Sequence, residues 1–212
     1  AIFKEDLKGL LAYSTISHLG LIMCLLGIGS PLAVAAAIFH IINHATFKAA
    51  LFMIAGIIDH ETGTRSIRKL GGLLTLMPIS FTMTLVTALS MAGIPPFNGF
   101  LSKELFLEAM FEISHANFSA LADWSVLFPI LGIVGSIFTF VYSLKLIHGV
   151  FFGDRSYDTP KEPHEAPALL LISPIILSAL VIIFGLFPNI LSGTIIDPAA
   201  MSILGTDTAL NT

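Results

Sequence analysis

The stretch IFHIINHATFKAALF, Ile38–Phe52, decides how the rest of the chain is organised. His40, His44 and Lys48 recur at every fourth position in a segment that otherwise has the composition of a buried helix. A helix turns once in about 3.6 residues, so these side chains lie nearly above one another over about 12 Å. The surrounding run, 32–58, is apolar and long enough to cross a bilayer. A charge facing lipid costs at least about 2.5 kcal/mol, so the basic stripe must face protein or water.

The composition of the whole chain indicates a membrane protein. Of its 212 residues, 55% are hydrophobic and 11% are charged, whereas soluble domains carry roughly 25% charged residues. The apolar runs are too continuous for an outer-membrane barrel, in which alternating segments of about ten residues are typical. We therefore predict an all-α fold, a polytopic bundle of membrane helices.

Charge and cysteine content exclude several other classes. The net charge is −4 without a block of one sign, so nucleic acid is not an expected partner. Cys24 stands alone in an apolar run, which excludes an intrachain disulfide framework and a cysteine metal cluster. The charged residues 1–8 do not resemble a signal peptide, and we expect the chain to begin partway through a larger protein.

Apolar runs separated by turn-forming or charged residues predict six membrane segments. Gly29-Ser30-Pro31 ends the first run, because glycine and proline interrupt helices. Residues 192–212 are polar enough to form a loop or the start of a further segment. The expected transmembrane domain is 1–191, with segments at 9–29, 32–58, 73–92, 100–118, 126–152 and 166–191.

A second unusual stretch, MAGIPPFNGFLSKELFLEAMF, spans Met91–Phe111. Its glycines and prolines predict a helix break, and a lysine and a glutamate follow directly. Non-helical backbone at membrane depth is tolerated only where it is buried in protein or lines a water-filled cavity, and such breaks often mark the ion pathway of a transporter. The break residues are Gly93, Pro95, Pro96 and Gly99, and the ionisable pair is Lys103 and Glu104.

The stripe of His40, His44 and Lys48 is open to three interpretations. The histidines could simply hydrogen-bond to carbonyls while Lys48 reaches the interface. Histidines four positions apart are also typical of zinc sites, but the HExxH pattern is absent and the neighbouring sequence offers no third ligand. The third interpretation is proton transfer, because histidine titrates near neutral pH and a lysine removed from water can also exchange protons. Three aligned basic groups in an apolar helix favour proton transfer.

The remaining ionisable residues allow both structural and functional roles. Lys103 and Glu104 could be a pair at the membrane surface, and Lys8 could anchor its helix at the interface. Lys145 is near enough to a segment end to reach water. The accessory candidates for a water-filled proton path are His18, Lys145 and His148.

Three motifs occur in an order that resembles a known family. They are D-L-K-x-x-L-A-Y-S-T-I-S-H at Asp6–His18, H-x-x-x-H-x-x-x-K-A-x-L-F at His40–Phe52 and G-F-x-S-K-E at Gly99–Glu104. Together they resemble the proton-conducting membrane transporters, which comprise the antiporter-like subunits of respiratory complex I and the large subunits of Mrp-type antiporters. HETGTRSIRKLGGL and AGIPPFNGFLSKELFLEAM are more similar to the Mrp A subunit than to the complex I chain 5 subunit.

This resemblance implies a fold and a set of residue roles. The fold is the second of two inverted five-helix repeats, with a discontinuous helix, followed by one further helix. The first repeat and its paired glutamate and lysine are absent, so we expect a fragment. Lys8 matches the lysine that connects the half-channels, and Lys103 matches the ionisable residue on the broken helix, with Glu104 as its acidic neighbour. His40, His44 and Lys48 match the histidine–lysine relay.

The expected function is that of a membrane subunit in a multisubunit Na⁺/H⁺ antiporter of the bacterial cell membrane. Such a subunit is a secondary transporter rather than an enzyme, and we expect neither catalytic residues nor a cofactor or metal. The implied partners are the other Mrp-type subunits, the lipid bilayer, and H⁺ and Na⁺ as transported ions. One alternative is a proton-pumping subunit of respiratory NADH:quinone oxidoreductase. The other is a membrane scaffold that conducts nothing.

Overall fold

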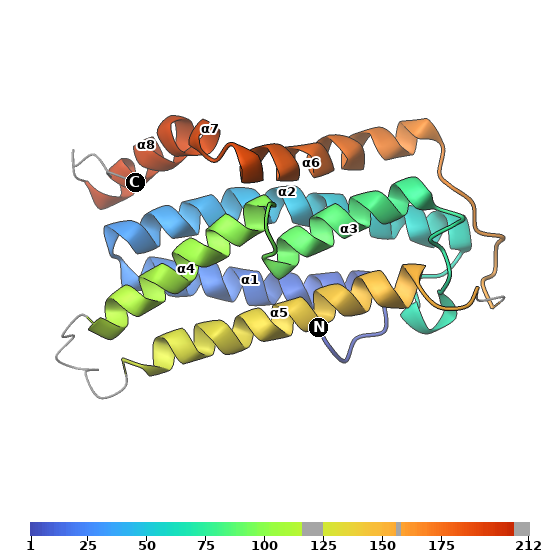
Figure 1. The fold of residues 1–212 in the computed structure, drawn as a ribbon, viewed down its shortest axis with the longest axis horizontal. Helices are drawn as coiled ribbons and strands as arrows, with labels where there is room; N and C mark the ends of the chain where they lie inside the picture. Colours follow the sequence, from blue (N-terminus) through green and yellow to red (C-terminus); the bar gives the residue numbers. More distant parts are fainter. Residues whose placement is uncertain (116–124, 156–157, 206–212) are drawn as a thin grey trace.

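A computed structural model describes residues 1–115, 125–155 and 158–205, and the regular structure of these residues is helical. The long helices lie roughly along one common direction (Figure 1). They are α1 (Leu7–Ile28), α2 (Pro31–Thr62), α3 (Pro78–Ala92), α4 (Asn98–His115), α5 (Leu127–Phe151) and α6 (Ala168–Leu186). Shorter elements are η1 (Ile67–Lys69), α7 (Asn189–Leu191), the π-helix η3 (Ser192–Ile196) and α8 (Asp197–Leu204).

Helices α1 and α2 form an antiparallel hairpin, and local sequence signals set its ends. Asp6 and Ser30 accept backbone N–H groups and cap the N-termini of α1 and α2. Gly29 ends α1 with a φ of 73°, a left-handed conformation that glycine adopts without strain. Pro31 is the first residue of α2, where its missing N–H has no cost. The hairpin therefore lays the predicted basic stripe of α2 along the neighbouring face of α1.

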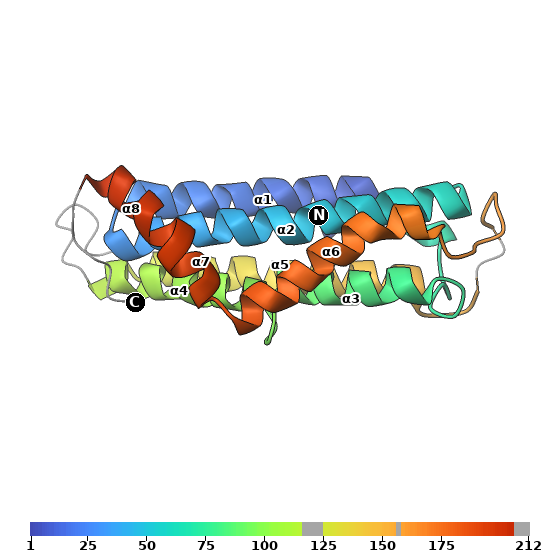
Figure 2. The ribbon, with the colours of Figure 1, turned by 90° about the horizontal axis from the view of Figure 1, so that it is seen from above.

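Helices α3 and α4 lie end to end along the bundle (Figures 1 and 2). The sequence placed segments at 73–92 and 100–118 and predicted a helix break and a discontinuous helix; α3 and α4 are the two halves of such an interrupted helix, beside α5. Pro78 is the first residue of α3, so 73–77 precede the helix instead of forming its first turn. The last three positions of the second predicted segment, 116–118, lie outside the described residues.

Helix α6 crosses the interrupted helix at its break. A Cβ at Gly185 of α6 would overlap the carbonyl oxygen of Pro96, so the absence of a side chain there allows direct backbone packing. Beyond α6 the chain continues through α7, η3 and α8 toward the far end of the bundle (Figure 2). The stretch 192–212, predicted as a loop or the start of a further segment, is helical over 192–204, and 206–212 lie outside the described residues.

Apolar and polar side chains are separated in the way that a membrane bundle requires. By length and composition α1, α2, α5 and α6 could each cross a bilayer. The outer faces carry exposed apolar residues, such as Ile133 and Ile137 of α5 and Ile176 of α6. Polar groups concentrate instead in the interior, and the buried ones on α1, α2 and α4 include Ser14, His18, His40, Asn43, Lys48, Asn98, Ser102 and Lys103.

Candidate functional site

Three histidines from two helices meet inside the bundle. His18 of α1 faces His40 and His44, which lie one turn apart on α2. Nδ1 of His18 is 2.9 Å from Nε2 of His40, and the two rings are nearly parallel with centroids 5.2 Å apart. The ring of His44 is also 5.2 Å from that of His18, and its Nε2 has no hydrogen-bond partner among the described residues. His18 and His40 are 2% and 1% exposed, so this pair is shielded from bulk solvent, whereas His44 is half-buried.

Hydroxyl groups extend the cluster in two directions. The Tyr142 hydroxyl of α5 is 3.3 Å from Nε2 of His18, and Nδ1 of His40 is 3.0 Å from Oγ of Ser102 on α4. The Ser102 hydroxyl donates to the Gly99 carbonyl, so its oxygen accepts from His40. When both rings are neutral, Tyr142 donates to His18 and His18 donates to His40. His40 in turn donates to Ser102, so each hydrogen bond has one donor and one acceptor. The contacts thus form a continuous hydrogen-bonded chain across α5, α1, α2 and α4.

Lys48 lies at the other end of the predicted stripe, one turn beyond His44. Its ammonium donates to the hydroxyl of Ser14 and to the carbonyl of Leu11, at 3.4 Å, both on α1. The side chain is 4% exposed, and Lys48 makes no ion pair within the described part of the chain. A buried lysine held by neutral acceptors alone lacks a countercharge, and its charged form is costly in such a place. Lys48 is therefore suited to gain and lose a proton.

Lys103 is held at the helix break. Its ammonium donates to the carbonyl of Ala92, the last residue of α3, at 2.9 Å. The final carbonyls of a helix carry a partial negative charge, which favours a cation at this position. The lysine stem passes close to Gly93, where a Cβ would lie 2.5 Å from Cδ of Lys103. The break thus supplies both space and an electrostatic partner for a lysine that is 7% exposed.

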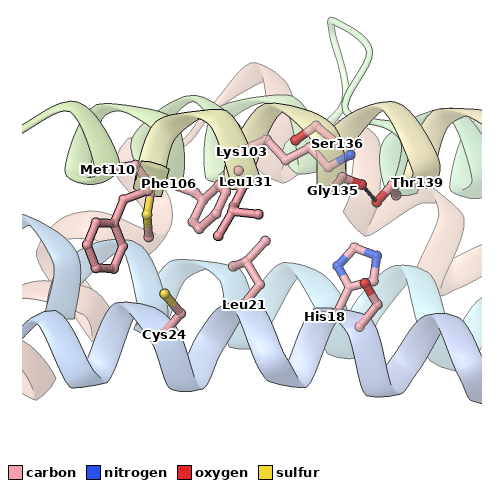
Figure 3. A pocket seen from close by; sticks show the side chains of 13 residues that line it. His18, Leu21, Cys24, Lys103, Phe106, Met110, Leu131, Gly135, Ser136 and Thr139 are labelled. Atoms are coloured by element: carbon pink, nitrogen blue, oxygen red, sulfur yellow. Dashed lines mark hydrogen bonds between the residues drawn. The ribbon is translucent and has the colours of Figure 1, made fainter. Parts of the chain in front are cut away.

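A cavity of about 260 Å³ lies between α1, α4 and α5 and includes both His18 and Lys103 in its lining. Figure 3 shows His18 reaching into it from α1 while Lys103 and Ser136 approach from the opposite side. The rest of the wall is largely apolar, with Leu21, Phe106 and Leu131 among the lining residues. One end of the cavity is therefore polar and basic, and it brings the lysine of the break and the histidine cluster to the same space.

The predicted break residues lie where the two half-helices meet. Gly93 has a φ of 82° and ends α3, while Pro95 and Pro96 occupy the connection to α4. Gly99 allows a close approach, because a Cβ there would overlap the carbonyl oxygen of Ser90. These residues permit a sharp interruption without a gap in packing.

Lys8 lies in the first turn of α1, in the same contact between α1 and α2, and pairs with Asp59 near the C-terminal end of α2 at 2.9 Å. The side chains of Lys8 and Asp59 are 39% and 33% exposed, so this pair is at the rim of the bundle. Lys8 precedes Ser14 by six residues, or about 9 Å of helix. Along this contact the order is therefore Lys8, Lys48 and then the histidine cluster.

Three other predicted residues are not brought to this cluster. Glu104 is exposed and lines a separate groove with Asn189 and Asp197, on a different face of α4 from Lys103. Lys145 donates to the carbonyls of Ile2 and Lys4 at 2.6 and 2.8 Å, which makes it an anchor for the N-terminal segment. His148 is exposed and stacks on Phe152.

The structure adds residues that the sequence interpretation missed or ranked low. His18 was an accessory candidate and is the centre of the cluster. Ser14 precedes His18 by four residues, which is the same spacing that separates the basic residues of the stripe on α2. Ser102 carried no signal of its own, because a serine hydroxyl in an apolar helix usually bonds to its own backbone. Tyr142 was missed because its partner His18 lies 124 positions away. Within the described residues, no three His, Cys, Asp or Glu side chains converge to hold a metal ion.

Comparison with known proteins gives concordant similarities. Residues 1–138 match the family model described as "NADH:quinone oxidoreductase/Mrp antiporter, TM". The chain is 61% identical over 216 aligned residues to the Na⁺/H⁺ antiporter subunit A1 of Staphylococcus haemolyticus, covering 95% of the chain and 27% of that protein. The chain thus spans about a quarter of the length of this curated relative.

Two solved structures share the fold over most of the chain. The Mrp complex from a Dietzia species matches with a TM-score of 0.82 at 32% identity, over 99% of this chain and 22% of that chain. The membrane-bound sulfane sulfur reductase, an archaeal respiratory membrane complex, matches with a TM-score of 0.75 at 40% identity, over 85% of this chain and 28% of that chain. The all-helical fold is thus that of antiporter-like membrane subunits, as the sequence predicted.

Proposed function

Because this chain belongs to the NADH:quinone oxidoreductase/Mrp antiporter transmembrane family, we propose that it is the proton-conducting part of a large subunit in an Mrp-type Na⁺/H⁺ antiporter. In this proposal the assembled complex lies in a bacterial cell membrane and exchanges Na⁺ for H⁺. The single observation that carries the proposal is the hydrogen-bonded chain from Tyr142 through His18 and His40 to Ser102. A bundle that only needed packing would fill these positions with apolar side chains.

The proposed path begins at the rim and ends at the helix break. Lys8 exchanges protons with the aqueous edge, and Lys48 carries them past Ser14 to His44. Nε2 of His44 has no partner in the described part of the chain and can accept a proton, and the ring of His18 is 5.2 Å away. His18 and His40 then conduct toward Ser102 and Lys103. Glu104 has no part in this path, because its side chain lies on another face of α4.

Electrostatic coupling between these groups gives the path its stepwise character. Two unit charges 4 Å apart interact by about 4 kcal/mol at an effective dielectric constant of 20. Protonation of one group in the interior therefore promotes release of a proton from its neighbour. Lys103 at the break completes the sequence, since the Ala92 carbonyl holds its ammonium until a charge arrives or leaves nearby.

The test of this proposal is exchange by the full-length complex carrying Lys48→Ala. Everted vesicles from antiporter-deficient cells are energised, and the collapse of the pH gradient on addition of Na⁺ is measured. We expect loss of exchange with normal assembly, because the substitution interrupts the path one turn from His44. Lys161→Ala, at an exposed lysine outside the path, is the matched control. Normal exchange by Lys48→Ala would refute the path.

One alternative is a proton-pumping subunit of a redox-driven complex, and the similarity to the archaeal respiratory complex favours considering it. The same interior would serve either assembly, so copurification is the discriminating measurement. Recovery with small antiporter subunits supports the proposal, and recovery with a quinone-reducing arm supports the alternative. A scaffold without conduction predicts instead that His44→Ala and Lys48→Ala alter only assembly.

A further inference from the structure

A set of buried amide and hydroxyl groups ties α2 to the break between α3 and α4. Nδ2 of Asn43 donates to the carbonyl of Asn98 at 3.1 Å, and Nδ2 of Asn98 donates back to Oδ1 of Asn43 at 2.9 Å. Nδ2 of Asn98 is also 3.2 Å from the hydroxyl of Thr46. Both asparagine side chains are completely buried. The pair is thus a reciprocal, two-bond link between the two helices.

The link is completed on the side of α3. The Ser90 hydroxyl donates to Oδ1 of Asn98 at 2.6 Å and accepts the backbone N–H of Gly99 at 3.1 Å. The amide of Asn98 therefore uses its oxygen and both hydrogens within the protein. A buried polar network whose members are all satisfied favours one arrangement of the packed elements, because any shift leaves a group unpaired. The network fixes the end of α3, the start of α4 and the centre of α2 against one another.

This network lies one turn from the proton path. Asn43 precedes His44 directly and follows His40 by three residues on α2. Asn98 precedes Ser102 by four residues, so the two share a face at the start of α4. The hydrogen bond from His40 to Ser102, at 3.0 Å, joins the same two helices next to the asparagine pair. A movement of the α4 start away from α2 would therefore lengthen that bond.

We propose that Asn43 and Asn98 are positioning residues that hold the Ser102 hydroxyl on Nδ1 of His40, so that the path stays continuous where it passes from α2 to α4. This inference rests on the proposed proton path but assigns a role to two residues that carry no proton themselves. An amide does not titrate, and so the role of the pair is geometric. Transfer along a hydrogen bond depends steeply on the placement of the donor and acceptor atoms.

The experiment uses the full-length complex in energised everted vesicles, with exchange expressed per assembled complex. We expect Asn98→Ala to lower the rate about tenfold, since misplacements of about 1 Å can cost a factor of that order or more. The Na⁺ concentration for half-maximal exchange should stay unchanged, because the proposed role of the pair is to place the Ser102 hydroxyl and not to bind Na⁺. Thr84→Val is the control, because it removes a buried side-chain hydrogen bond within α3, to the carbonyl of Ser80, away from the break.

A double variant separates positioning from general stabilisation. Ser102→Ala already removes the acceptor of His40, so Asn98→Ala on that background should add little to the loss. The proposal is overturned if Asn98→Ala lowers exchange by the same factor on the Ser102→Ala background as on the wild-type background. Substitutions that act through one interaction are non-additive. If Asn98→Ala does not assemble, Asn43→Ser provides the same comparison with a smaller change and no added charge.

The outcome for His40→Ala distinguishes failure of this inference from failure of the proposed function. Loss of exchange in His40→Ala with normal exchange in Asn98→Ala and Asn43→Ser would leave the path intact and overturn the positioning role. Normal exchange in His40→Ala would overturn the path itself, and the positioning role with it.

Discussion

A hydrogen bond of 2.9 Å joins Nδ1 of His18 to Nε2 of His40 and connects α1 to α2 across 22 positions of sequence. The contact converts a stripe on one helix into a cluster shared by two. It also places the tyrosine of α5 and the serine of α4 at opposite ends of one chain of donors and acceptors. The predictions that follow depend on this relationship and on the groups that extend it.

His18 should be as important for exchange as the histidines of the predicted stripe. His18→Ala removes the only ring that contacts both His40 and Tyr142 among the described residues. We expect at least a tenfold lower rate of Na⁺-driven pH-gradient collapse per assembled complex, because the path loses a member and not only a hydrogen bond. His164→Ala, at an exposed position, should exchange normally. Equal rates in the two variants would remove His18 from the path.

Lys48→Arg should assemble but fail to exchange. Arginine retains the positive charge and can still donate to Ser14, but its guanidinium does not release a proton at physiological pH. The expected result is normal recovery of the complex with exchange lowered to the level of Lys48→Ala. Substantial exchange by Lys48→Arg would mean that the position requires a charge, not a titrating group.

Gly93→Ala should impair exchange through Lys103. Gly93 has a φ of 82°, and an added Cβ would lie 2.5 Å from Cδ of Lys103. The left-handed conformation alone costs about 1–2 kcal/mol for an alanine. Gly29→Ala is the matched control, because its φ is 73° but its Cβ would meet nothing within 4 Å. We expect both variants to lose thermal stability of the purified complex and Gly93→Ala alone to lose exchange. Loss of exchange in both variants would mean that backbone strain, and not the contact with Lys103, causes the loss.

Lys8→Arg tests whether the lysine at the rim carries protons or only anchors the helix. Arginine preserves the ion pair with Asp59, which at this exposure contributes at most about 1 kcal/mol. We expect assembly to be normal and exchange to fall severalfold, since the new side chain cannot release its proton. The measurement is the exchange rate across a range of external pH values. A wild-type rate at every pH would make Lys8 an interface anchor.

The proposed functional residues divide into those that sequence reasoning could find and those that it could not. Lys48 and Lys103 were found because a buried charge in an apolar run is conspicuous whatever its neighbours. Asn43 and Asn98 were missed because a single amide in a helix has no period or motif, and its meaning depends on a partner 55 positions away. Glu104 was included because the family resemblance has an acidic residue at that position, but it lies on another face of α4, since neighbouring residues on a helix point about 100° apart.

The sequence by itself determined the helical class, the turn at Gly29-Ser30-Pro31, the break after Ala92 and the alignment of His40, His44 and Lys48. These features are local, since they depend on hydrophobic composition, on the special backbone preferences of glycine and proline and on the helical repeat. The tertiary structure alone decided that both halves of the interrupted helix pack beside α5 and that His18 meets His40. It also decided which side of α4 faces the cluster. Periodicity defines the faces of one helix, but packing between helices determines which two faces meet.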